Sequence, residues 1–161
     1  MRISALLFRR PPDSICSMNE SRVYKPAGPE RMAIRERLRA ALERHAEISF
    51  AYLHGSFVGG EGFRDIDVAV YLRANEAESR LRYELALEAS LSKDSCGYPV
   101  DVRILNAAPL SFRYQVIKGG DLLFERDDDE RADFQEATLS AYFDFEPYRA
   151  LYLKETLGRG I

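Results

Sequence analysis

The sequence contains little cysteine, no long apolar run and no excess of basic residues. It has 2 cysteines among 161 residues, and Cys16 and Cys96 are too far apart for a CxxC pair, so nothing indicates a disulfide framework or a cysteine zinc site. No apolar run approaches the roughly 18 to 20 residues of a membrane helix, and we expect no membrane contact. The formal net charge of −3 argues against a protein that coats nucleic acid, and we expect no direct nucleic-acid binding.

The first residues also lack the features of an export signal. The apolar stretch from Ile3 to Phe8 is interrupted by Ser4 and is shorter than a secretory core segment, so we expect a cytoplasmic protein. Residues 1–28 combine prolines, serines and arginines without a sustained period, which predicts a poorly ordered arm. We expect residues 29–161 to form one domain with a C-terminal helical segment, because the chain is too short for two separate cores.

What the sequence does contain is an alternation of extended and helical patterns. Strands are predicted over residues 48–53, 65–72, 99–105 and 122–124. Helices are predicted over residues 29–46, 75–93 and 109–117, from the acidic stretch 127–129 onward, and again from Pro147. The helical positions expected to face the core are Ile34, Leu38, Ala41, Leu42, Ala77, Leu81, Leu85, Ala89, Phe134, Ala137, Ala141 and Tyr142. This order predicts an α/β (α+β) domain with a small sheet.

Three acidic residues and a glycine-serine pair fall near the ends of predicted strands. Gly55 and Ser56 follow the first strand, Asp65 and Asp67 begin the second, and Asp101 lies in the third. Side chains two apart on a strand share a face at a spacing of about 6.6 to 7 Å. Neighbouring carboxylates repel one another unless a cation lies between them, and Mg²⁺ prefers oxygen ligands from carboxylates and substrate phosphates.

The glycine-serine pair offers the other half of a nucleotide site. If Ser56 begins a short helix, its backbone amides favour an anion, and Gly55 lets a phosphate approach the main chain. Asp101 could then ligate the metal or accept a proton from an attacking hydroxyl. Each feature alone has a plainer interpretation, as a turn, a solvated strand edge or a structural carboxylate. Their order, with a glycine-rich loop between them, favours metal-dependent nucleotide chemistry.

These residues also carry a resemblance to a known family. It rests on two stretches, LHGSFVGGEGFRDIDVAVYL and, about thirty residues later, PVDVRIL. They resemble the minimal nucleotidyltransferase (MNT) branch of the polymerase β superfamily, and more specifically the MNT-type adenylyltransferase antitoxins that pair with HEPN toxins. The sequence from Asn106 to Tyr148 is similar to the downstream region of those antitoxins, so the resemblance covers roughly residues 30–155.

The resemblance implies a nucleotidyltransferase fold, a small mixed sheet flanked by helices. It also implies Mg²⁺ as cofactor, ATP as AMP donor, and a HEPN-type toxin whose tyrosine receives the AMP. On the family pattern, Gly55 and Ser56 match the nucleotide-phosphate motif. Asp65 and Asp67 match the paired metal ligands, and Asp101 matches the third carboxylate.

The sequence departs from the family pattern in the loop between the serine and the first aspartate. Residues 57–64 make this loop eight residues long, whereas ten are common in the family. Arg64 stands where a serine is usual, and it could contact a phosphate or be solvated. The strand positions themselves are intact, so the loop geometry is affected more than the chemistry.

Other polar residues also have two interpretations each. His54 could face the nucleotide, or pack and hydrogen bond at the strand end. Arg113 and Lys118 could reach the triphosphate or be surface charges. Arg39 and His45 match the R-x4-6-H spacing of HEPN ribonucleases, but they end a helix ahead of a strand, which favours a coincidence.

The end of the chain combines acidic and aromatic residues. Residues 121–146 hold ten acidic and two basic groups, a balance of −8. Five apolar residues near this stretch are spaced so that they gather into one patch: Phe143, Phe145, Tyr148, Leu151 and Tyr152. They could close the core, or they could form a docking surface for a basic partner.

Three functions remain open on the sequence. The first is an antitoxin that transfers AMP to a HEPN toxin, and the second is an antitoxin that acts by binding alone. The third is a small-molecule adenylyltransferase of the aminoglycoside type, which normally needs a further substrate domain. A homo-oligomer is compatible with all three.

Overall fold

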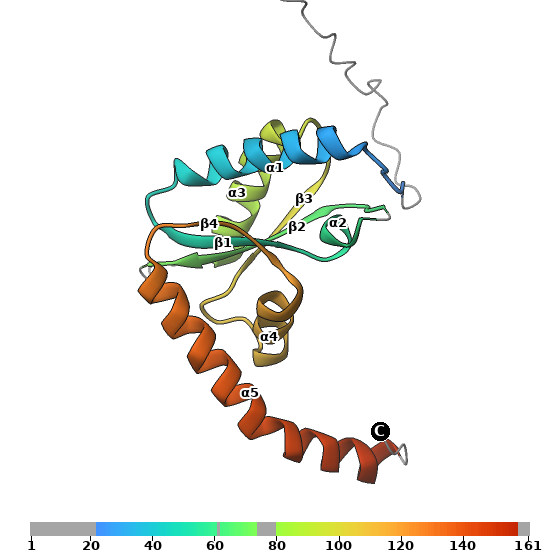
Figure 1. The fold of residues 1–161 in the computed structure, drawn as a ribbon, viewed down its shortest axis with the longest axis vertical. Coiled ribbons are helices and arrows are strands. Elements are labelled where there is room, and N and C mark those ends of the chain that lie inside the picture. Colours follow the sequence, from blue (N-terminus) through green and yellow to red (C-terminus); the bar gives the residue numbers. More distant parts are fainter. Residues whose placement is uncertain (1–21, 61, 74–79, 158–161) are drawn as a thin grey trace, which may run out of the picture.

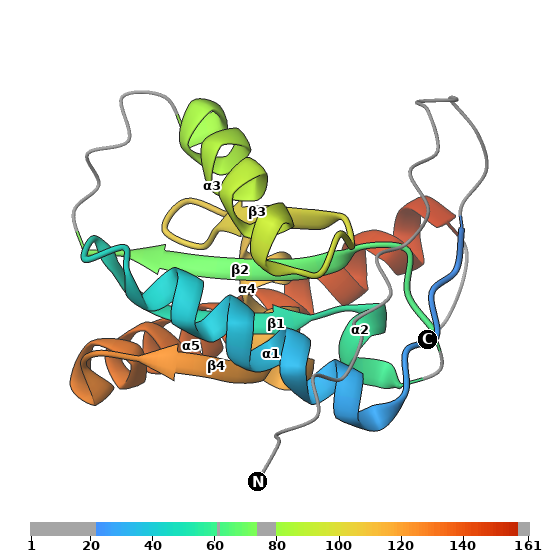
Figure 2. The same ribbon diagram turned by 90° about the horizontal axis from the view of Figure 1, so that it is seen from above.

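The computed structural model describes residues 22–60, 62–73 and 80–157. Its elements are α1 (Gly28–Glu43), β1 (Ile48–His54), α2 (Ser56–Gly59), β2 (Ile66–Leu72), α3 (Arg80–Asp94), β3 (Val100–Ile104), α4 (Leu110–Gly119), β4 (Asp121–Glu125) and α5 (Asp128–Leu157). Figures 1 and 2 show a sheet with α1 and α3 on one face and α4 and α5 on the other. The predicted small mixed sheet flanked by helices is confirmed. None of the helices in these ranges has the length and hydropathy of a membrane span.

The four strands form one sheet in the order β3-β2-β1-β4. Strand β1 pairs antiparallel with β2 and β4, whereas β2 and β3 are parallel. Six of the seven residues of the central strand β1 are buried, because helices cover both faces of the sheet. The pairing aligns His54 with Asp67, and Asp67 with Asp101. Three polar residues therefore lie side by side across β1, β2 and β3.

The core lies on both sides of the sheet. The predicted inward face of α1 is confirmed, since its four buried residues are Ile34, Leu38, Ala41 and Leu42. They pack with alternate residues of the sheet, among them Leu53 and Val68. On the opposite face Phe50 stacks on Tyr71, with ring centroids 4.7 Å apart. Burying each large apolar side chain stabilises the fold by about 1.5 to 3 kcal/mol.

The predicted inward face of α3 is wrong. Leu81 and Leu85 are 63% and 55% exposed, and Ala89 is also exposed, while Ala77 lies outside the described residues. The buried residues of α3 are Leu87 and Leu91.

The carboxylates of α3 explain why the helix turns a different face toward the sheet from the one predicted. The backbone amide of Ile104 donates to Glu84 Oε1 at 2.9 Å, and that of Val102 donates to Glu88 Oε1 at 3.1 Å. Strand β3 is at the sheet edge, where unpaired amides would otherwise need water. Because the glutamates face the strand, the leucines at positions 81 and 85 are turned outward.

The C-terminal region forms one helix where two were predicted. Helix α5 continues through Pro147, and Figure 1 shows the helix curving away from the sheet. Pro147 is tolerated because it removes one intrahelical hydrogen bond in an exposed part of the helix. The buried residues near its start are Phe134 and Thr138. The predicted inward positions Ala137 and Ala141 are exposed, since the contact face follows a four-residue spacing that begins at Phe134.

Part of the expected N-terminal arm packs on the domain. Residues 1–21 lie outside the described range. Tyr24 pairs with Phe63 through two backbone hydrogen bonds of 2.7 and 3.1 Å, and its ring lies edge-on to Tyr98 at 4.9 Å. The packed domain therefore extends to residues before Pro29.

Candidate active site

The sheet register brings the candidate residues together at one end. His54, Asp67 and Asp101 occupy neighbouring positions on β1, β2 and β3, so their backbones are about 4.8 Å apart from each strand to the next. Asp65 lies exposed in the bend before β2. We call the three carboxylates Asp65, Asp67 and Asp101 the carboxylate row. Their predicted role as metal ligands stays a prediction.

The electrostatics of the row centre on Asp67. Burial, followed by the negative charges of Asp65 and Asp101, raises the pKa of Asp67 from its ordinary 3.8 to about 6, and Arg103 opposes this shift. The only nearby cation that acts on it in the described chain is this arginine, whose Nη2 lies 3.4 Å from Asp101 Oδ2. Negative charge therefore exceeds positive charge around a half-buried carboxylate, which is the condition that a divalent cation relieves.

The chemistry of these donors fits magnesium. Among residues 22–60, 62–73 and 80–157, no group of three or more His, Cys, Asp and Glu is arranged to hold a metal ion by itself. Mg²⁺ is usually bound by one or two carboxylates together with water and substrate phosphates. An incomplete protein ligand set beside an exposed aspartate therefore suits a metal that arrives with a nucleotide.

Gly55 allows the chain to pass close to Asp67. Its φ of +69° is in the left-handed region, where residues with a side chain are strained. A Cβ at this position would overlap Asp67 Oδ2 and lie 3.0 Å from its Cγ. Ser56 begins the short helix α2, as predicted, and the preceding glycine has no side chain to cap its first amides. Gly55 and Ser56 therefore adjoin the carboxylate row.

His54 faces this row and Phe112 of α4. The two rings meet edge-on at 5.3 Å. Burial lowers the pKa of His54, although the negative charge of Asp101 opposes the shift, so burial favours the neutral ring. Its Nε2 atom is buried without a hydrogen-bond partner among the described residues. Of its two interpretations, the position next to the carboxylate row favours contact with a bound substrate.

Arg31 was not singled out by the sequence. Its guanidinium lies over the rings of Phe57 at 5.0 Å and Phe63 at 5.7 Å. Its Nε and Nη2 atoms are buried and find no hydrogen-bond partner in the described part of the chain. It supplies positive charge beneath the glycine-rich loop, whereas Arg64 is exposed in the bend before β2. No sequence signal separates Arg31 from the other arginines of α1, because its aromatic partners come from a distant segment.

Two other basic candidates have local partners. The Nε of Arg113 donates to the carbonyl of Ala108 at 3.0 Å. Lys118 Nζ lies 5.8 Å from the ring centroid of Tyr114. These contacts favour the plainer interpretation of both residues as structural or surface charges.

The R-x4-6-H spacing is explained by surface ion pairs. Arg39 Nε lies 2.9 Å from Glu43 Oε1. His45 Nδ1 lies 3.3 Å from Glu47 Oε1. The first pair is within the last turns of α1 and the second lies just before β1, whereas the carboxylate row adjoins the end of β1, so the pairs give no reason to expect ribonuclease chemistry.

The raised pKa of Asp67 predicts a pH-dependent response to magnesium. A carboxyl with a folded-state pKa of about 6 and an ordinary value of 3.8 favours folding most below about pH 4, and this contribution is lost as pH rises through 6. Mg²⁺ bound to the ionised carboxylate offsets the loss. Because the site suits a metal that arrives with a nucleotide, we expect Mg²⁺ added together with AMP-PNP to raise the melting temperature more at pH 7 than at pH 5, measured by scanning fluorimetry. Asp67→Asn should show no such difference, and an equal Mg²⁺ response at both pH values in the unmodified protein would contradict the prediction.

The comparison with protein families gives one match. The family model described as Polymerase beta, Nucleotidyltransferase matches residues 36–129. This range contains the carboxylate row and the Gly55–Ser56 pair. A search of curated proteins finds no match.

Solved structures with a similar fold include chains of toxin–antitoxin complexes. One comes from a complex of a tri-AMPylated Shewanella oneidensis HEPN toxin with an MNT antitoxin, at 19% identity and a TM-score of 0.61, covering 80% of this chain and 98% of the other. A second comes from a toxin–antitoxin structure with AMP-PNP, at 22% identity and a TM-score of 0.62, covering 79% and 98%. A third, from an MntA–HepT complex, has 20% identity and a TM-score of 0.59, covering 81% and 99%. At these identities the likeness shows a shared fold.

Proposed function

The chain belongs to the polymerase β nucleotidyltransferase family, and from that premise we propose that it is an antitoxin that transfers AMP from Mg-ATP to a tyrosine of a HEPN ribonuclease toxin. The observation that carries the proposal is the alignment of Asp67 with Asp101 beside Gly55 and Ser56. The fold shared with a chain of a tri-AMPylated HEPN toxin complex supports this choice of acceptor. A cytoplasmic setting follows from the proposal, since ATP and the toxin's RNA substrate are there.

Each residue of the site has a distinct role in this reaction. Asp65 and Asp67 hold the metal-bound nucleotide, with Asp101 able to complete the ligand set, and the backbone at Gly55 and Ser56 accommodates its phosphates. Bound Mg²⁺ would polarise the phosphate and stabilise the charge that develops on it. The tyrosine oxygen forms a bond to the α-phosphorus, and the bond to the β-phosphate oxygen breaks to release pyrophosphate. Asp101 accepts the hydroxyl proton.

The two alternatives are less well supported. A small-molecule adenylyltransferase normally carries a substrate domain, whereas the described residues after β4 form a single helix, α5. An antitoxin that acts by binding alone has no need of a glycine that fits against Asp67, or of a carboxylate whose pKa is raised by its neighbours. Close approach of the backbone to a side chain and a shifted pKa are both typical of sites that bind a ligand.

The direct test mixes the purified protein with its proposed partner, a HEPN ribonuclease, and ATP labelled at the α-phosphate. We expect Mg²⁺-dependent labelling of a toxin tyrosine, located by mass spectrometry, together with loss of ribonuclease activity. Inhibition without label would indicate an antitoxin that acts by binding alone. Label on an aminoglycoside and none on the toxin would indicate the small-molecule enzyme.

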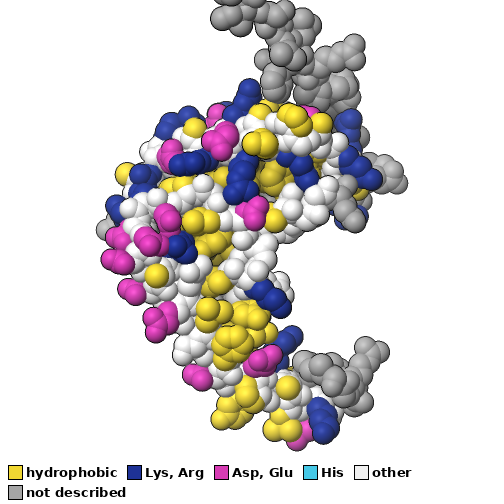
Figure 3. All heavy atoms as spheres, in the orientation of Figure 1, with side chains coloured by type: hydrophobic (Ala, Val, Ile, Leu, Met, Phe, Trp, Pro, Cys, Tyr) yellow, Lys and Arg dark blue, Asp and Glu magenta, His cyan; other side chains and the backbone are white. Residues whose placement is uncertain are grey.

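The C-terminal half of α5 is the surface that we expect to hold the toxin. Its exposed apolar residues are Phe143, Phe145, Tyr148, Leu151 and Tyr152, and Figure 3 shows apolar side chains gathered along this part of the molecule. The acidic groups of residues 121–146 lie next to them in the chain. A ribonuclease must present positive charge to RNA, so acidic groups would attract it and the aromatic residues would retain it.

Tyr152→Ala therefore weakens the complex more than the removal of one acidic group. We expect the dissociation constant to rise about tenfold or more for Tyr152→Ala, and only a few-fold for Asp129→Ala because exposed charges contribute little individually. The association rate should fall as salt increases. Biolayer interferometry at two salt concentrations measures both quantities. Equal binding of Tyr152→Ala and the unmodified protein would place the docking surface elsewhere.

A further inference from the structure

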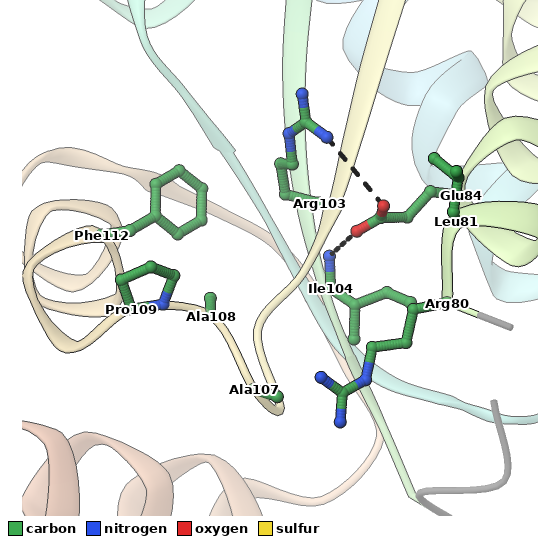
Figure 4. A pocket seen from close by; sticks show the side chains of 9 residues that line it. All are labelled: Arg80, Leu81, Glu84, Arg103, Ile104, Ala107, Ala108, Pro109 and Phe112. Atoms are coloured by element: carbon green, nitrogen blue, oxygen red, sulfur yellow. Dashed lines mark hydrogen bonds and ion pairs between the residues drawn. The ribbon is translucent and has the colours of Figure 1, made fainter. Parts of the chain in front are cut away.

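A cavity of about 480 Å³ is lined in part by Arg103, the ion-pair partner of Asp101. It is formed by the start of α3, the end of β3 and the start of α4, and Figure 4 shows Phe112 and Pro109 on one side with Ile104 and Arg103 on the other. Most of its surface is apolar. Leu81, which is exposed and is not part of the core, also lines the cavity.

Each wall of this cavity has one residue that contacts Asp101 or His54. Arg103, on the first wall, is within 3.4 Å of Asp101 Oδ2 and 3.9 Å of Glu84 Oε2. Phe112, on the second wall, meets the ring of His54 at 5.3 Å. Two residues that line the cavity therefore also contact residues at the end of the sheet where Asp101 lies.

The direction of phosphoryl transfer places the acceptor on this side. In an in-line displacement the attacking oxygen and the leaving group lie on opposite sides of the phosphorus. The proposed phosphate site at Gly55 and Ser56 is at the end of β1, so the leaving pyrophosphate lies toward β1. The acceptor hydroxyl must then approach from β3, past Asp101.

We propose that this cavity binds the side chain of the acceptor tyrosine, with its hydroxyl directed toward Asp101; the inference rests on the function proposed above. Arg103 is two residues beyond Asp101 on the same face of β3, about 7 Å along the strand, a distance that a tyrosine side chain spans. Phe112 offers an aromatic partner for the ring, and Arg103 offers a cation near its face. The exposed Leu81 adds apolar surface at the α3 side of the cavity.

A substitution that fills the cavity without touching the row tests this assignment. Ala107 lines the cavity and is exposed, so Ala107→Phe reduces the space with little effect on folding. Ala40→Phe, at an exposed position of α1, is the matched control. We expect Ala107→Phe to raise the KM for the toxin about tenfold or more and to leave the KM for ATP within about twofold. Ala107→Leu provides a smaller filling variant, and the melting temperature of each variant checks that it folds.

A competition experiment separates the tyrosine side chain from the rest of the toxin surface. The labelled tyrosine is first identified, and toxins with Phe or Ala in its place are used as inhibitors. The Phe toxin should inhibit the unmodified protein more strongly than the Ala toxin, and this difference should disappear with Ala107→Phe.

The remaining outcomes overturn the inference in distinguishable ways. If Ala107→Phe raises the KM for ATP or weakens AMP-PNP binding, and the toxin KM is unchanged, the cavity holds the nucleobase. If neither changes, the cavity has no part in the reaction. If the unmodified protein places no label on the toxin, the proposed function itself fails, and this inference fails with it.

Discussion

Asp67→Asn abolishes AMP transfer to the toxin while the protein remains folded. Asp67 lies between Asp65 and Asp101, and its pKa of about 6 reflects burial next to their negative charges. Asparagine keeps the shape of the side chain but removes the charge that a metal-bound nucleotide needs. A loss of about 4 kcal/mol of transition-state stabilisation corresponds to about a thousandfold in rate.

The same substitution should not reduce stability, and this separates a catalytic effect from unfolding. Because burial and the neighbouring carboxylates disfavour the charged form of Asp67, we expect a melting temperature equal to or above that of the unmodified protein in the absence of metal. Labelled AMP transfer and scanning fluorimetry measure the two effects.

Two further substitutions define what the carboxylate row does. Asp65→Asn should lose transfer as fully as Asp67→Asn. Asp101→Asn should also lose transfer but retain nucleotide binding better than either, because its role falls mainly on the hydroxyl that is activated. Undiminished labelling by both Asp65→Asn and Asp67→Asn would refute the mechanism.

Gly55→Ala is expected to have the second largest effect. A methyl group at this position overlaps the Asp67 carboxylate, and the φ of +69° is unfavourable for alanine. The strain costs about 1 to 2 kcal/mol of stability, and displacement of the carboxylate lowers the transfer rate by about a hundredfold. Urea unfolding measures the first quantity and AMP labelling the second.

Gly59→Ala is the matched control for this prediction. Gly59 is in the same glycine-rich segment, but a Cβ there meets nothing within 4 Å and its φ is not in the left-handed region. We expect it to leave both activity and stability nearly unchanged. If Gly55→Ala behaves like Gly59→Ala, the close approach of this glycine to Asp67 is not needed for function.

The positions of the candidate site residues in the strands and turns were predictable, because local rules place them. A glycine-serine pair after an apolar strand predicts a tight turn into a helix, and Ser56 does begin α2. The inward face of α1 was equally predictable from its period.

Long-range contacts decided the parts that were predicted wrongly. The orientation of α3 depends on Glu84 and Glu88, whose carboxylates accept hydrogen bonds from the edge strand β3. Their partners are 20 and 14 residues away, respectively, so no helical period could show that these residues, and not Leu81 and Leu85, face the sheet. The sequence likewise gave no sign that α5 would continue through Pro147, because a proline is compatible both with the start of a helix and with an exposed interior position.

The sequence by itself determined which residues are candidates for chemistry and where they fall in the strands, since residue type and strand period depend only on neighbouring positions. Only the tertiary structure decided how these residues interact. The parallel pairing of β2 with β3 aligns Asp67 with Asp101, and burial beside two other carboxylates raises the Asp67 pKa. The cavity between α3, β3 and α4 also exists only in the folded chain. Pairing, burial and cavities arise from contacts between distant segments, and such contacts form only when the whole domain packs around its sheet.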